Sequence, residues 1–496
     1  MSNESKNVMI GLEVHIQLSK LKTKLFCGCN NDYHGAEPNS HVCPICIGLP
    51  GTLPVVNKKA IEFATRLAIA LNCDINNHFW FFRKNYFYPD MSKNFQISQY
   101  NKSGGKAFAD NGKITIKLNS QKKDIILNRI HLEEDPARLV HKGSIATSPY
   151  TLVDYNRSGV CLIEIVTEPI ISSPEEAREF LKQLKSIVQY LEISNLDLEG
   201  SVRVDANISI KGYERSEVKN INSFKEVERA LRHEIIRQKN LLKRGRELIQ
   251  ETRHWDDKRR ITISMRTKEF EADYRYFPEQ DLVPIEIDNN YIQKVKDELP
   301  EMPNERSIRL RRDYLLSEFD SDNLVLDKEL ADFYENGVNS EASFGPNEYK
   351  QYCNWLMNDI LRWLNEHDNI LKDTKIHPHQ IVDLINYVNE GKITTKIAKS
   401  IIDDIMKGFS IQEILEMKNK KRIFNEKLLR DLSNEVIEEN IKIVKDCREN
   451  PKAIEALIGR VMGKTRGQAD PHITRTIMNH LLKEKGIISK NFLKTE

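Results

Sequence analysis

A glutamate and a histidine lie two residues apart in the most regular strand-like segment of this sequence. In VMIGLEVHIQL (Val8–Leu18), Glu13 and His15 alternate with apolar residues. Because successive side chains of a β-strand point to opposite faces, this spacing puts the carboxylate and the imidazole on one face. The pair could therefore bind one metal ion or one phosphate.

The same alternation of polar and apolar residues recurs in later segments. Their polar positions are Arg129, His131 and Glu133, then Glu164 and Glu168, then Arg203, Asp205, Asn207 and Ser209, then Thr262, Ser264, Arg266 and Lys268. For each strand alone, one wet face of an antiparallel sheet is the simpler explanation. A merely wet face carries Lys, Thr, Ser and Gln, whereas here Glu, His, Asp, Asn and Arg dominate. That mixture suits Mg²⁺ held by carboxylates beside cations that bind phosphates, so an open sheet with a metal and phosphate site on its polar face is expected.

Two close pairs of cysteines flank a loop rich in Gly, Pro and Asn. They are Cys27, Cys29, Cys43 and Cys46. The number and spacing of these ligands predict a structural Zn²⁺ site, although Cys-x-Cys is less usual than Cys-x-x-Cys. His34 and His41 could each replace a ligand, and buried reduced thiols are the alternative. The site is expected to fix a loop too short to build a core, not to do chemistry.

Length and charge place few limits on function. The chain has 496 residues, so about two to four domains are expected. Its net charge of +2 is too small to predict nucleic-acid binding. Basic residues crowd 229–260 and 418–422, where solvated helix faces are the ordinary explanation and an RNA contact is the alternative. The sequence shows no signal peptide or membrane span, and its cysteines fit a reducing compartment, so a cytoplasmic location is expected.

Capping signals divide the chain into a strand-rich part and a helical part. Asn57, Ser173 and Ser223 are each expected to cap a helix, with Glu176 completing a capping box. Strands interrupted by such helices predict an α+β domain to about Asp288.

A junction with two prolines and a charged run follows, at 300–313. Beyond it nearly every segment is amphipathic, which predicts one or two helical bundles. The predicted helices cover 348–365, 379–390, 394–407, 411–418, 425–450, 452–462 and 472–485.

Two further stretches are ambiguous in sequence. RKNYFYPDMSKNFQISQY, residues 83–100, mixes aromatics with cations that can stack a base and touch phosphate, but core aromatics beside a turn are equally common. GRVMGKT, residues 459–465, lacks the glycine spacing and the preceding strand of a P-loop. It is expected to be a tight helix–helix turn that offers Lys464 and Arg466 to a phosphate backbone. No motif for an amide-cleaving nucleophile is present.

Motifs of unlike composition, in an order that spans essentially the whole chain, resemble those of the B subunits of glutamyl/aspartyl-tRNA amidotransferases. They are IGLEVHIQL, KLFCGC…CPICIGLPG, RKNYFYPDMSKNFQISQY, HLEEDPARL, LVDYNRSGVCLIEIVTEP, SVRVDANIS, EVKNINSF, MRTKEFEADYRYFPEQDLVP, CNWLMNDI and GRVMGKTRGQADP. The resemblance implies a carbon–nitrogen ligase with glutamine as nitrogen donor. ATP would phosphorylate the side-chain carboxylate of Glu-tRNA(Gln) or Asp-tRNA(Asn), and ammonia would displace the phosphate. The ammonia would come from a separate amidase (glutaminase) subunit, with a small third subunit in the same complex.

The resemblance also implies roles for individual residues. The Mg²⁺ ligands would be His15, Glu133 and Glu164, with Glu13 as a further one. Phosphates and a second metal would be oriented by Arg203, Asp205, Asn207, Lys219 and Asn220. Weaker candidates for ATP or the tRNA end are Arg266, Lys268, Asp273 and Arg275. A structural ion pair is the alternative for each. The cysteines match the zinc-bearing family members, and others lack them, so zinc would not be essential to the reaction.

The resemblance implies an α+β fold with three domains. Residues 1–295 would form a catalytic cradle on an antiparallel sheet similar to that of glutamine-synthetase-like ligases, with the zinc knuckle at 27–46. Residues 296–415 would form a helical domain, and 416–496 an all-α tail that binds tRNA. Two rival functions are a ligase for a small carboxylic acid, which the helical C-terminal part argues against, and a non-catalytic tRNA-binding scaffold.

Overall fold

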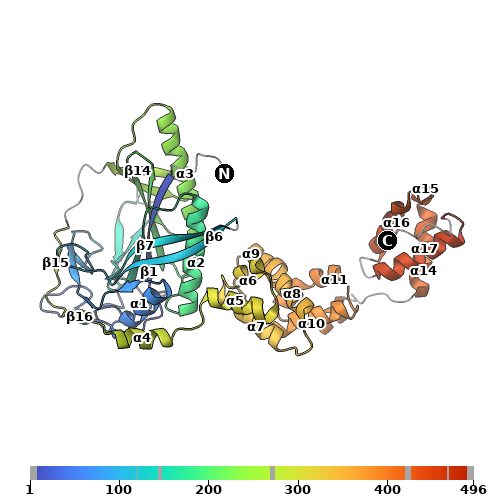
Figure 1. Ribbon diagram of the computed structural model, residues 1–496, viewed down its shortest axis with the longest axis horizontal. Helices are drawn as coiled ribbons and strands as arrows, with labels where there is room; N and C mark the ends of the chain where they lie inside the picture. The colour runs from blue at the N-terminus through green and yellow to red at the C-terminus, as the bar shows by residue number, and fades with distance from the viewer. Residues whose placement is uncertain are drawn as a thin grey trace. The chain divides into compact units, whose positions relative to one another are not determined.

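The chain folds into two compact units, Met1–Arg306 and Ser307–Glu496. The computed structural model describes residues 8–119, 121–142, 148–267, 274–418, 426–448, 450–465 and 469–488. The first unit is built on a large sheet covered by helices, and the second is helical (Figure 1). This mixed composition agrees with the α+β class predicted from the sequence.

A nine-stranded sheet forms the centre of the first unit, in the order β14-β13-β12-β11-β1-β10-β7-β6-β2. Its strands are β1 (Val8–Gln17), β2 (Asp74–Ile75), β6 (Ala109–Leu118), β7 (Gln121–Glu134), β10 (Cys161–Thr167), β11 (Val202–Ile210), β12 (Ser216–Ile221), β13 (Glu251–Asp256) and β14 (Ile261–Thr267). All neighbours are antiparallel except β12 and β13. Because β1 is the middle strand, its side chains have neighbours on both sides.

One face of this sheet is the apolar core of the unit. On β1, Leu12 and Val14 are essentially inaccessible to solvent. Three helices contribute to the same core: α1 (Lys58–Ala70), α2 (Pro174–Leu191) and α3 (Phe224–Lys243). Figure 1 shows α2 and α3 along one side of the sheet, where they pack on β6 and β11. The opposite face of the central strands carries the polar residues of the alternation.

The capping residues predicted from the sequence begin these helices. The side chains of Asn57, Ser173 and Ser223 accept hydrogen bonds from the first turns of α1, α2 and α3. The capping box differs in one respect, because the Glu176 carboxylate accepts from the N–H of Ser172 at 2.9 Å and not from Ser173. The helix start is therefore tied to the residue before its cap.

Three small sheets surround the large one. A three-stranded sheet orders β15 (Phe277–Pro278), β4 (Phe82–Asn85) and β5 (Phe95–Ser98). The two-stranded sheets pair β16 (Ile285–Glu286) with β3 (His78–Phe79), and β8 (Arg138–His141) with β9 (Thr151–Asp154). Strand β5 packs against β7, so the 83–100 stretch lies beside the large sheet.

The edge strand β14 reverses the predicted alternation. Ile263 and Met265 are 37% and 61% exposed, whereas Thr262 is 5% exposed. The reason lies in a buried polar network: Thr262 Oγ1 donates to Glu234 on α3 at 2.9 Å and accepts from Arg253 on β13 at 2.9 Å. Buried charges need hydrogen-bond partners, so a hydroxyl fits this position better than an isoleucine would.

The boundary between the two compact units, after Arg306, lies within the predicted junction at 300–313, but most of this junction is a helix. Two unpredicted helices, α4 (Asn289–Asp297) and α5 (Pro303–Tyr314), follow the last strand. Pro303 is compatible with the first turn of a helix, and Leu310 is fully buried. Arg309 is paired with Glu335 at 2.5 Å, which explains how a highly charged segment packs as a helix.

The second unit contains the helices predicted after residue 348, with several breaks. Its elements are α6 (Glu318–Leu324), α7 (Lys328–Asn339), α8 (Pro346–Asn354), the π-helical η2 (Trp355–Ile360), α9 (Leu361–Glu366), η3 (Leu371–Asp373), α10 (Pro378–Asn389), α11 (Thr395–Ser400), α12 (Ile402–Met406), α13 (Ile411–Lys418), α14 (Glu426–Glu439), α15 (Ile441–Asp446), η4 (Pro451–Ala453), α16 (Ile454–Lys464) and α17 (Pro471–Glu484). The predicted helices 394–407 and 425–450 are each divided in two. Helices α14, α16 and α17 share an apolar core. In the described part of the chain, no helix has both the length and the apolar character needed to cross a bilayer.

The GRVMGKT segment is not a turn. Gly459 and Gly463 lie within α16, and Lys464 is its last residue. The Lys464 ammonium is 2.8 Å from carboxylates of Glu435 and Glu439 on α14. The prediction of a helix–helix turn is therefore wrong, and Lys464 is held by ion pairs. Arg466 lies outside the described residues.

Candidate functional site

Four strands each place one polar residue in a row across the polar face of the sheet. Arg203 on β11 lies opposite His15 on β1. His15 lies opposite Glu164 on β10, which lies opposite His131 on β7. Neighbouring strands are about 4.8 Å apart, so adjacent side chains of this row can interact.

The imidazole of His15 lies among three carboxylates. Its Nε2 is 3.3 Å from Glu13 Oε1, 3.6 Å from Glu164 Oε2 and 3.7 Å from Glu133 Oε1. One donor atom each from Glu13, His15 and Glu164 lie within 4.8 Å of one another. The structure therefore brings together all the residues predicted to bind Mg²⁺, from three strands. We call Glu13, His15, Glu133 and Glu164 the carboxylate cluster.

The charges of this cluster are strongly coupled. Burial and the charge of Glu164 raise the pKa of Glu13 to about 7. Burial would also raise the pKa of Glu164, but hydrogen bonds from His131 and His15 hold it well below its ordinary value. Burial and Arg203 would lower the pKa of His15, yet its bond to Glu164 and the charge of Glu13 raise it overall. Carboxylates crowded in a buried setting repel one another, and a divalent cation would relieve that repulsion.

Neighbouring side chains fix the orientation of the cluster. The hydroxyl of Ser98, on β5, donates to Glu133 Oε2 at 2.8 Å. The ring of His131 contacts Glu164 Oε1 through Nδ1 at 3.4 Å. Its other nitrogen is 2.5 Å from Asn101 Oδ1. The segment at 98–101 therefore borders the cluster and supports it from outside the large sheet.

A second polar group lies beside the cluster on β11 and β12. In the register, Asp205 is opposite Glu13. Asp205 accepts from the N–H of Asn220 at 3.0 Å and lies 3.6 Å from Lys219 Nζ. A bulge interrupts the pairing of β11 with β12 here, and Asn220 has φ +63°. Bulges often re-aim side chains next to active sites, so this irregularity explains how Asp205, Lys219 and Asn220 come together.

Arg203 and Asn207 complete the predicted residues on β11. Burial would lower the pKa of Arg203, but the charges of Asp205 and Asp135 raise it overall. Its Nε is buried and has no hydrogen-bond partner among the described residues. A cation with an unused donor is suited to an anionic oxygen such as that of a phosphate. Asn207 is two residues from Asp205, opposite Gly11 on β1.

Of the weaker candidates, Arg266 lies far from the cluster along the sheet. The backbone of Arg266 is on β14, with β13, β12 and β11 between it and β1. At the usual strand spacing this separation is about 19 Å. Lys268 and Asp273 lie outside the described residues. Arg275 is exposed, with φ +45°, in the segment that leads into β15.

Several arginines of the basic stretch at 229–260 are paired with acids. Arg232 on α3 is 2.6 Å from Glu175 and 2.8 Å from Glu228. Arg237 is 2.6 Å from Glu234. On α3, these ion pairs occupy arginines that would otherwise be available to an RNA phosphate, which agrees with a solvated helix face there.

The four cysteines converge. Sulfur atoms of Cys27, Cys29, Cys43 and Cys46 all lie within 4.8 Å of one another. The fully buried Lys24 donates to the carbonyl of His41 at 2.7 Å and lies 3.7 Å from Cys46 Sγ. A hydrogen bond from Cys27, assisted by the charge of Lys24, lowers the pKa of Cys46 to about 4. The ring of His34 contacts Asp32 and the carbonyl of Glu199 instead of the thiols.

Sequence reasoning gave no role to several supporting residues. Arg129 donates to Glu164 Oε1 at 3.3 Å, and His131 contacts the same oxygen. The alternation placed both on the polar face with Glu133, but it did not show that they support Glu164. Ser98 and the buried Lys24 have no periodic signal, because they reach their sites through contacts distant in sequence.

The family comparisons cover both units. Residues 8–293 match the family described as GatB/GatE catalytic domain, and residues 332–482 match the family described as GatB domain. The first match contains the carboxylate cluster, the cysteines and the whole nine-stranded sheet.

Full-length relatives are also similar to this chain. The B subunit of the aspartyl/glutamyl-tRNA(Asn/Gln) amidotransferase of Sulfolobus acidocaldarius is 46% identical to this chain over 482 residues. The aligned region covers 97% of this chain and 100% of that protein. Identity is 44% over 486 residues to the protein of the same name from Carboxydothermus hydrogenoformans, covering 96% and 98%. It is 45% over 485 residues to that of Thermotoga maritima, covering 96% and 98%. The similarity thus extends over the sheet and the helical part alike.

Proposed function

Because the chain belongs to the GatB/GatE family, we propose that it catalyses the ATP-dependent amidation of Glu-tRNA(Gln) or Asp-tRNA(Asn). It acts as the B subunit of a glutamine-dependent carbon–nitrogen ligase. The carboxylate cluster is the observation that supports this function at a defined site. There, Glu13, Glu133 and Glu164 surround His15 on the polar face of the sheet.

Amidation of a carboxylate requires activation. A carboxylate is a poor acylating agent because its leaving group would be oxide, whereas an acyl phosphate releases phosphate. Phosphoryl transfer depends chiefly on positioning and on neutralising charge. The acyl phosphate must also be kept from water until ammonia arrives. The site therefore needs cations for the phosphates and an enclosed carboxylate pocket.

We assign Mg²⁺ to the carboxylate cluster, with His15, Glu133 and Glu164 as ligands and Glu13 as a further one. Donor atoms of Glu13, His15 and Glu164 lie within 4.8 Å of one another and Glu133 Oε1 is 3.7 Å from His15, and this crowding of carboxylates supports the fit. When bound, magnesium would neutralise charge on the nucleotide phosphates. The Ser98 hydroxyl and the His131 ring hold Glu133 and Glu164 in the ligand orientation.

Residues beside the cluster bind the phosphates of ATP. The unused Nε donor of Arg203 and the ammonium of Lys219 supply positive charge next to Glu13 and Asp205. Asn207 and Asn220 supply amide donors from the same part of the sheet. We assign Arg275, which is exposed in the segment that leads into β15, to binding of the tRNA end.

We assign Zn²⁺ to the four cysteines as a structural ion. Four thiols that converge within 4.8 Å form the ligand set of a closed tetrahedral site. The buried ammonium of Lys24 would offset part of the negative charge that four thiolates retain around Zn²⁺. The knuckle thereby fixes the 27–46 loop against the sheet.

The division of the chain fits a ligase that grips tRNA. We assign residues 1–295 to a catalytic cradle whose open antiparallel sheet resembles that of glutamine-synthetase-like ligases, 296–415 to a helical domain and 416–496 to a tRNA-binding tail. The chain divides into two compact units after Arg306, which supports a boundary near residue 295. The proposed partners are an amidase (glutaminase) subunit that supplies ammonia and a small third subunit. We assign the reaction to the cytoplasm, because its substrate is an aminoacyl-tRNA.

A reconstituted assay tests this function. The complex with its amidase partner receives ATP, glutamine and either Glu-tRNA(Gln) or Asp-tRNA(Asn), and ammonium replaces glutamine when the partner is omitted. Glu133→Gln is expected to bind tRNA normally but to lose at least ~10²-fold in amidation. If Glu133→Gln amidates at the rate of the unmodified chain, the protein is a scaffold and the proposal fails.

Deletion of the tail separates tRNA from a small-acid substrate. Removing the residues after Lys407 is expected to abolish amidation, because the helical part grips the tRNA. A truncated chain that still amidates free glutamate or aspartate would support the small-acid ligase instead.

A further inference from the structure

A row of aromatic side chains leads from the carboxylate cluster to the surface of the first unit. The rings of Tyr100 and Tyr276 stack, with centroids 4.1 Å apart and planes 8° apart. Tyr274 lies 6.2 Å from Tyr276 and 6.2 Å from Tyr86. Tyr86 lies 6.5 Å from Tyr88. We call these five side chains the tyrosine row.

The inner end of the tyrosine row borders the carboxylate cluster. Tyr100 lies in the segment in which Ser98 donates to Glu133 and Asn101 contacts His131. Burial, with the negative charges of Glu133 and Glu164, raises the pKa of its stacking partner Tyr276. The row therefore begins where the reacting carboxylate must lie.

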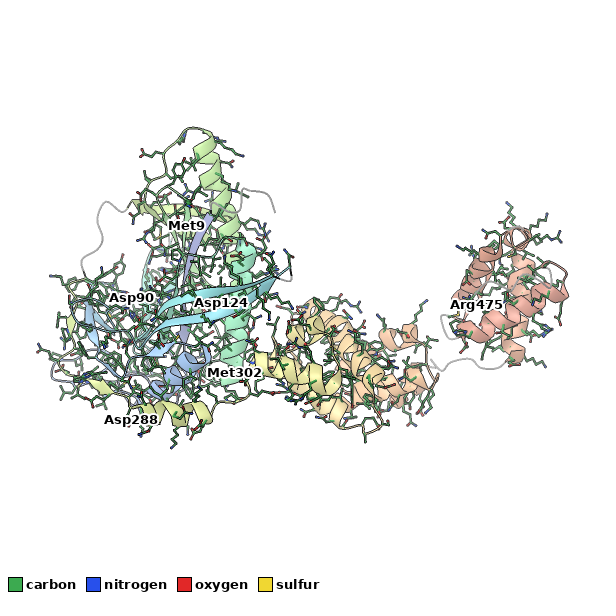
Figure 2. The ribbon with its side chains drawn as sticks, viewed as in Figure 1. Met9, Asp90, Asp124, Asp288, Met302 and Arg475 are labelled. Carbon is green, nitrogen blue, oxygen red and sulfur yellow. The ribbon has the colours of Figure 1, made fainter. Side chains whose placement is uncertain are left out.

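The outer end of the tyrosine row opens to solvent. Tyr88 is 65% exposed and its neighbour Phe87 is 69% exposed, whereas Tyr86 is half-buried. Asp90, labelled in Figure 2, belongs to the same loop, and its carbonyl accepts from the N–H of Ala137 at 2.9 Å. This bond ties the loop to the chain just after β7. Of the five rings, Tyr88 alone is exposed and the other four are half-buried, so the row meets solvent at its outer end.

A lysine adds positive charge to the middle of the row. Lys84 Nζ lies 5.1 Å from the ring centre of Tyr274 and 5.9 Å from that of Tyr86. Among the described residues it makes no ion pair with a carboxylate, whereas the preceding Arg83 is 2.7 Å from Glu279. Aromatic platforms combined with cations are the means by which proteins bind single-stranded nucleic acid.

We propose that the tyrosine row binds the single-stranded 3′ end of the aminoacyl-tRNA, with the terminal base at Tyr86 and Tyr274 and the preceding base at Tyr88. This inference rests on the proposed function. A free nucleotide would need one base site next to the cluster, and the exposed outer aromatics would serve no purpose for it. A polynucleotide that enters from solvent meets Tyr88 first. Stacking tolerates any base, which is sufficient for an end shared by the tRNAs of both amino acids.

Steady-state kinetics of the complete complex test this proposal, with aminoacyl-tRNA and ATP varied in turn. Tyr86→Ala and Tyr88→Ala are each expected to lower kcat/KM for aminoacyl-tRNA by roughly five- to 150-fold, the range for loss of one stacked base, and to leave the KM for ATP unchanged. Tyr86→Phe keeps the ring and is expected to restore the rate. Tyr213→Ala is the matched control, because Tyr213 is 53% exposed and lies outside the row.

The outcomes separate the possible occupants. If Tyr86→Ala raises the KM for ATP and leaves kcat/KM for aminoacyl-tRNA unchanged, the row holds the adenine of ATP and the proposal is wrong. If neither alanine variant changes either constant, the row is only a packing feature and the proposal is also wrong. Because Tyr88 is exposed, a melting temperature like that of the unmodified chain will show that Tyr88→Ala is folded. An unmodified complex that amidates no aminoacyl-tRNA would instead overturn the proposed function, and this inference with it.

Discussion

His15 and Glu164 lie directly opposite each other on β1 and β10, and their side chains approach to 3.6 Å. On the other side of β1, Arg203 of β11 lies opposite His15. The neighbouring positions Val14 and Ile165 also face each other and are fully buried. Because a slip of one residue would turn every side chain to the other face, the apolar core fixes the register that assembles the polar site.

Removal of the Glu164 charge is expected to stop activation of the aminoacyl group. Glu164→Gln removes the negative charge that His15 and His131 share, and it weakens a proposed metal ligand. We expect amidation to fall by at least ~10²-fold, with a higher magnesium concentration needed for half-maximal rate and unchanged tRNA binding. Amidation kinetics at several magnesium concentrations and a filter-binding assay measure the two effects.

Glu168 provides the matched control for Glu164. It lies just beyond β10, and its carboxylate accepts from Asn128 at 2.5 Å, a partner outside the carboxylate cluster. Glu168→Gln is expected to amidate within about twofold of the unmodified chain. Equal losses in both variants would mean that any carboxylate lost from this segment disturbs the sheet, and the assignment of Glu164 to the metal would fail.

Loss of the Arg203 guanidinium is expected to weaken ATP binding. Arg203→Met keeps most of the length of the side chain but removes the buried donor that lacks a partner among the described residues. A hydrogen bond to a charged group contributes about 1.5–3 kcal/mol, so the KM for ATP should rise by roughly 10- to 150-fold. Arg232→Met, on an ion-paired helix face, is the control and should leave this KM unchanged. If Arg203→Met alters only the melting temperature, Arg203 is a structural ion pair.

Alternation along β1, β7, β10 and β11 was sufficient to predict which side chains share the polar face. Its period of two is set by a buried apolar face, so it selects Glu13, His15, Glu133 and Glu164 without knowledge of the strand order. The actual pairing, which makes Glu164 the neighbour of His15, required the structure. The convergence of the four cysteines was predictable for a different reason, because their ligand spacing is local in sequence.

The remaining features depend on contacts that are distant in sequence. Ser98 reaches Glu133 from a separate small sheet, so no periodic pattern could have assigned it to the site. At β14, the buried carboxylate of Glu234 on α3 needs hydrogen-bond donors. Thr262 is therefore buried beside it, and Ile263 is exposed on the opposite face of the strand. The charged helix α5 was missed because ion pairs such as Arg309 with Glu335 replace the apolar stripe by which helices are recognised.

Disruption of the cysteine cluster is expected to remove zinc and to destabilise the first unit. Cys43→Ser and Cys46→Ser each delete one of four converging ligands. We expect the zinc content, measured by mass spectrometry of the purified chain, to fall from one ion per chain to near zero, and the melting temperature to fall with it. Cys73→Ser, outside the cluster, should retain zinc. A native chain purified without zinc would show that the cluster is a set of reduced thiols.

The buried Glu234 links the stability of the sheet edge to pH. Its carboxylate accepts from Arg237 at 2.6 Å, from Gln238 at 2.9 Å and from Thr262 at 2.9 Å. Burial would raise the pKa of Glu234, but these hydrogen bonds, with the charge of Arg237, hold it below its ordinary value. A carboxylate with a lowered pKa in the folded state stabilises the fold above its unfolded-state pKa, and the stabilisation is lost as the pH falls through the folded-state value.

Glu234→Gln is therefore expected to lower the free energy of unfolding by about 1.5–3 kcal/mol at neutral pH, because Arg237 and Arg253 lose one of their two buried carboxylate partners and keep only Glu251. The difference between the variant and the unmodified chain should shrink as the pH falls below about 4.3, where the glutamate becomes protonated in the unfolded state. Urea unfolding of both proteins at a series of pH values measures this difference. The exposed Glu199, paired with Arg138, provides a control in which Glu199→Gln should change stability by less than about 1 kcal/mol. A pH-independent loss in Glu234→Gln would mean that the side chain contributes through packing, and that its charge does not stabilise this edge.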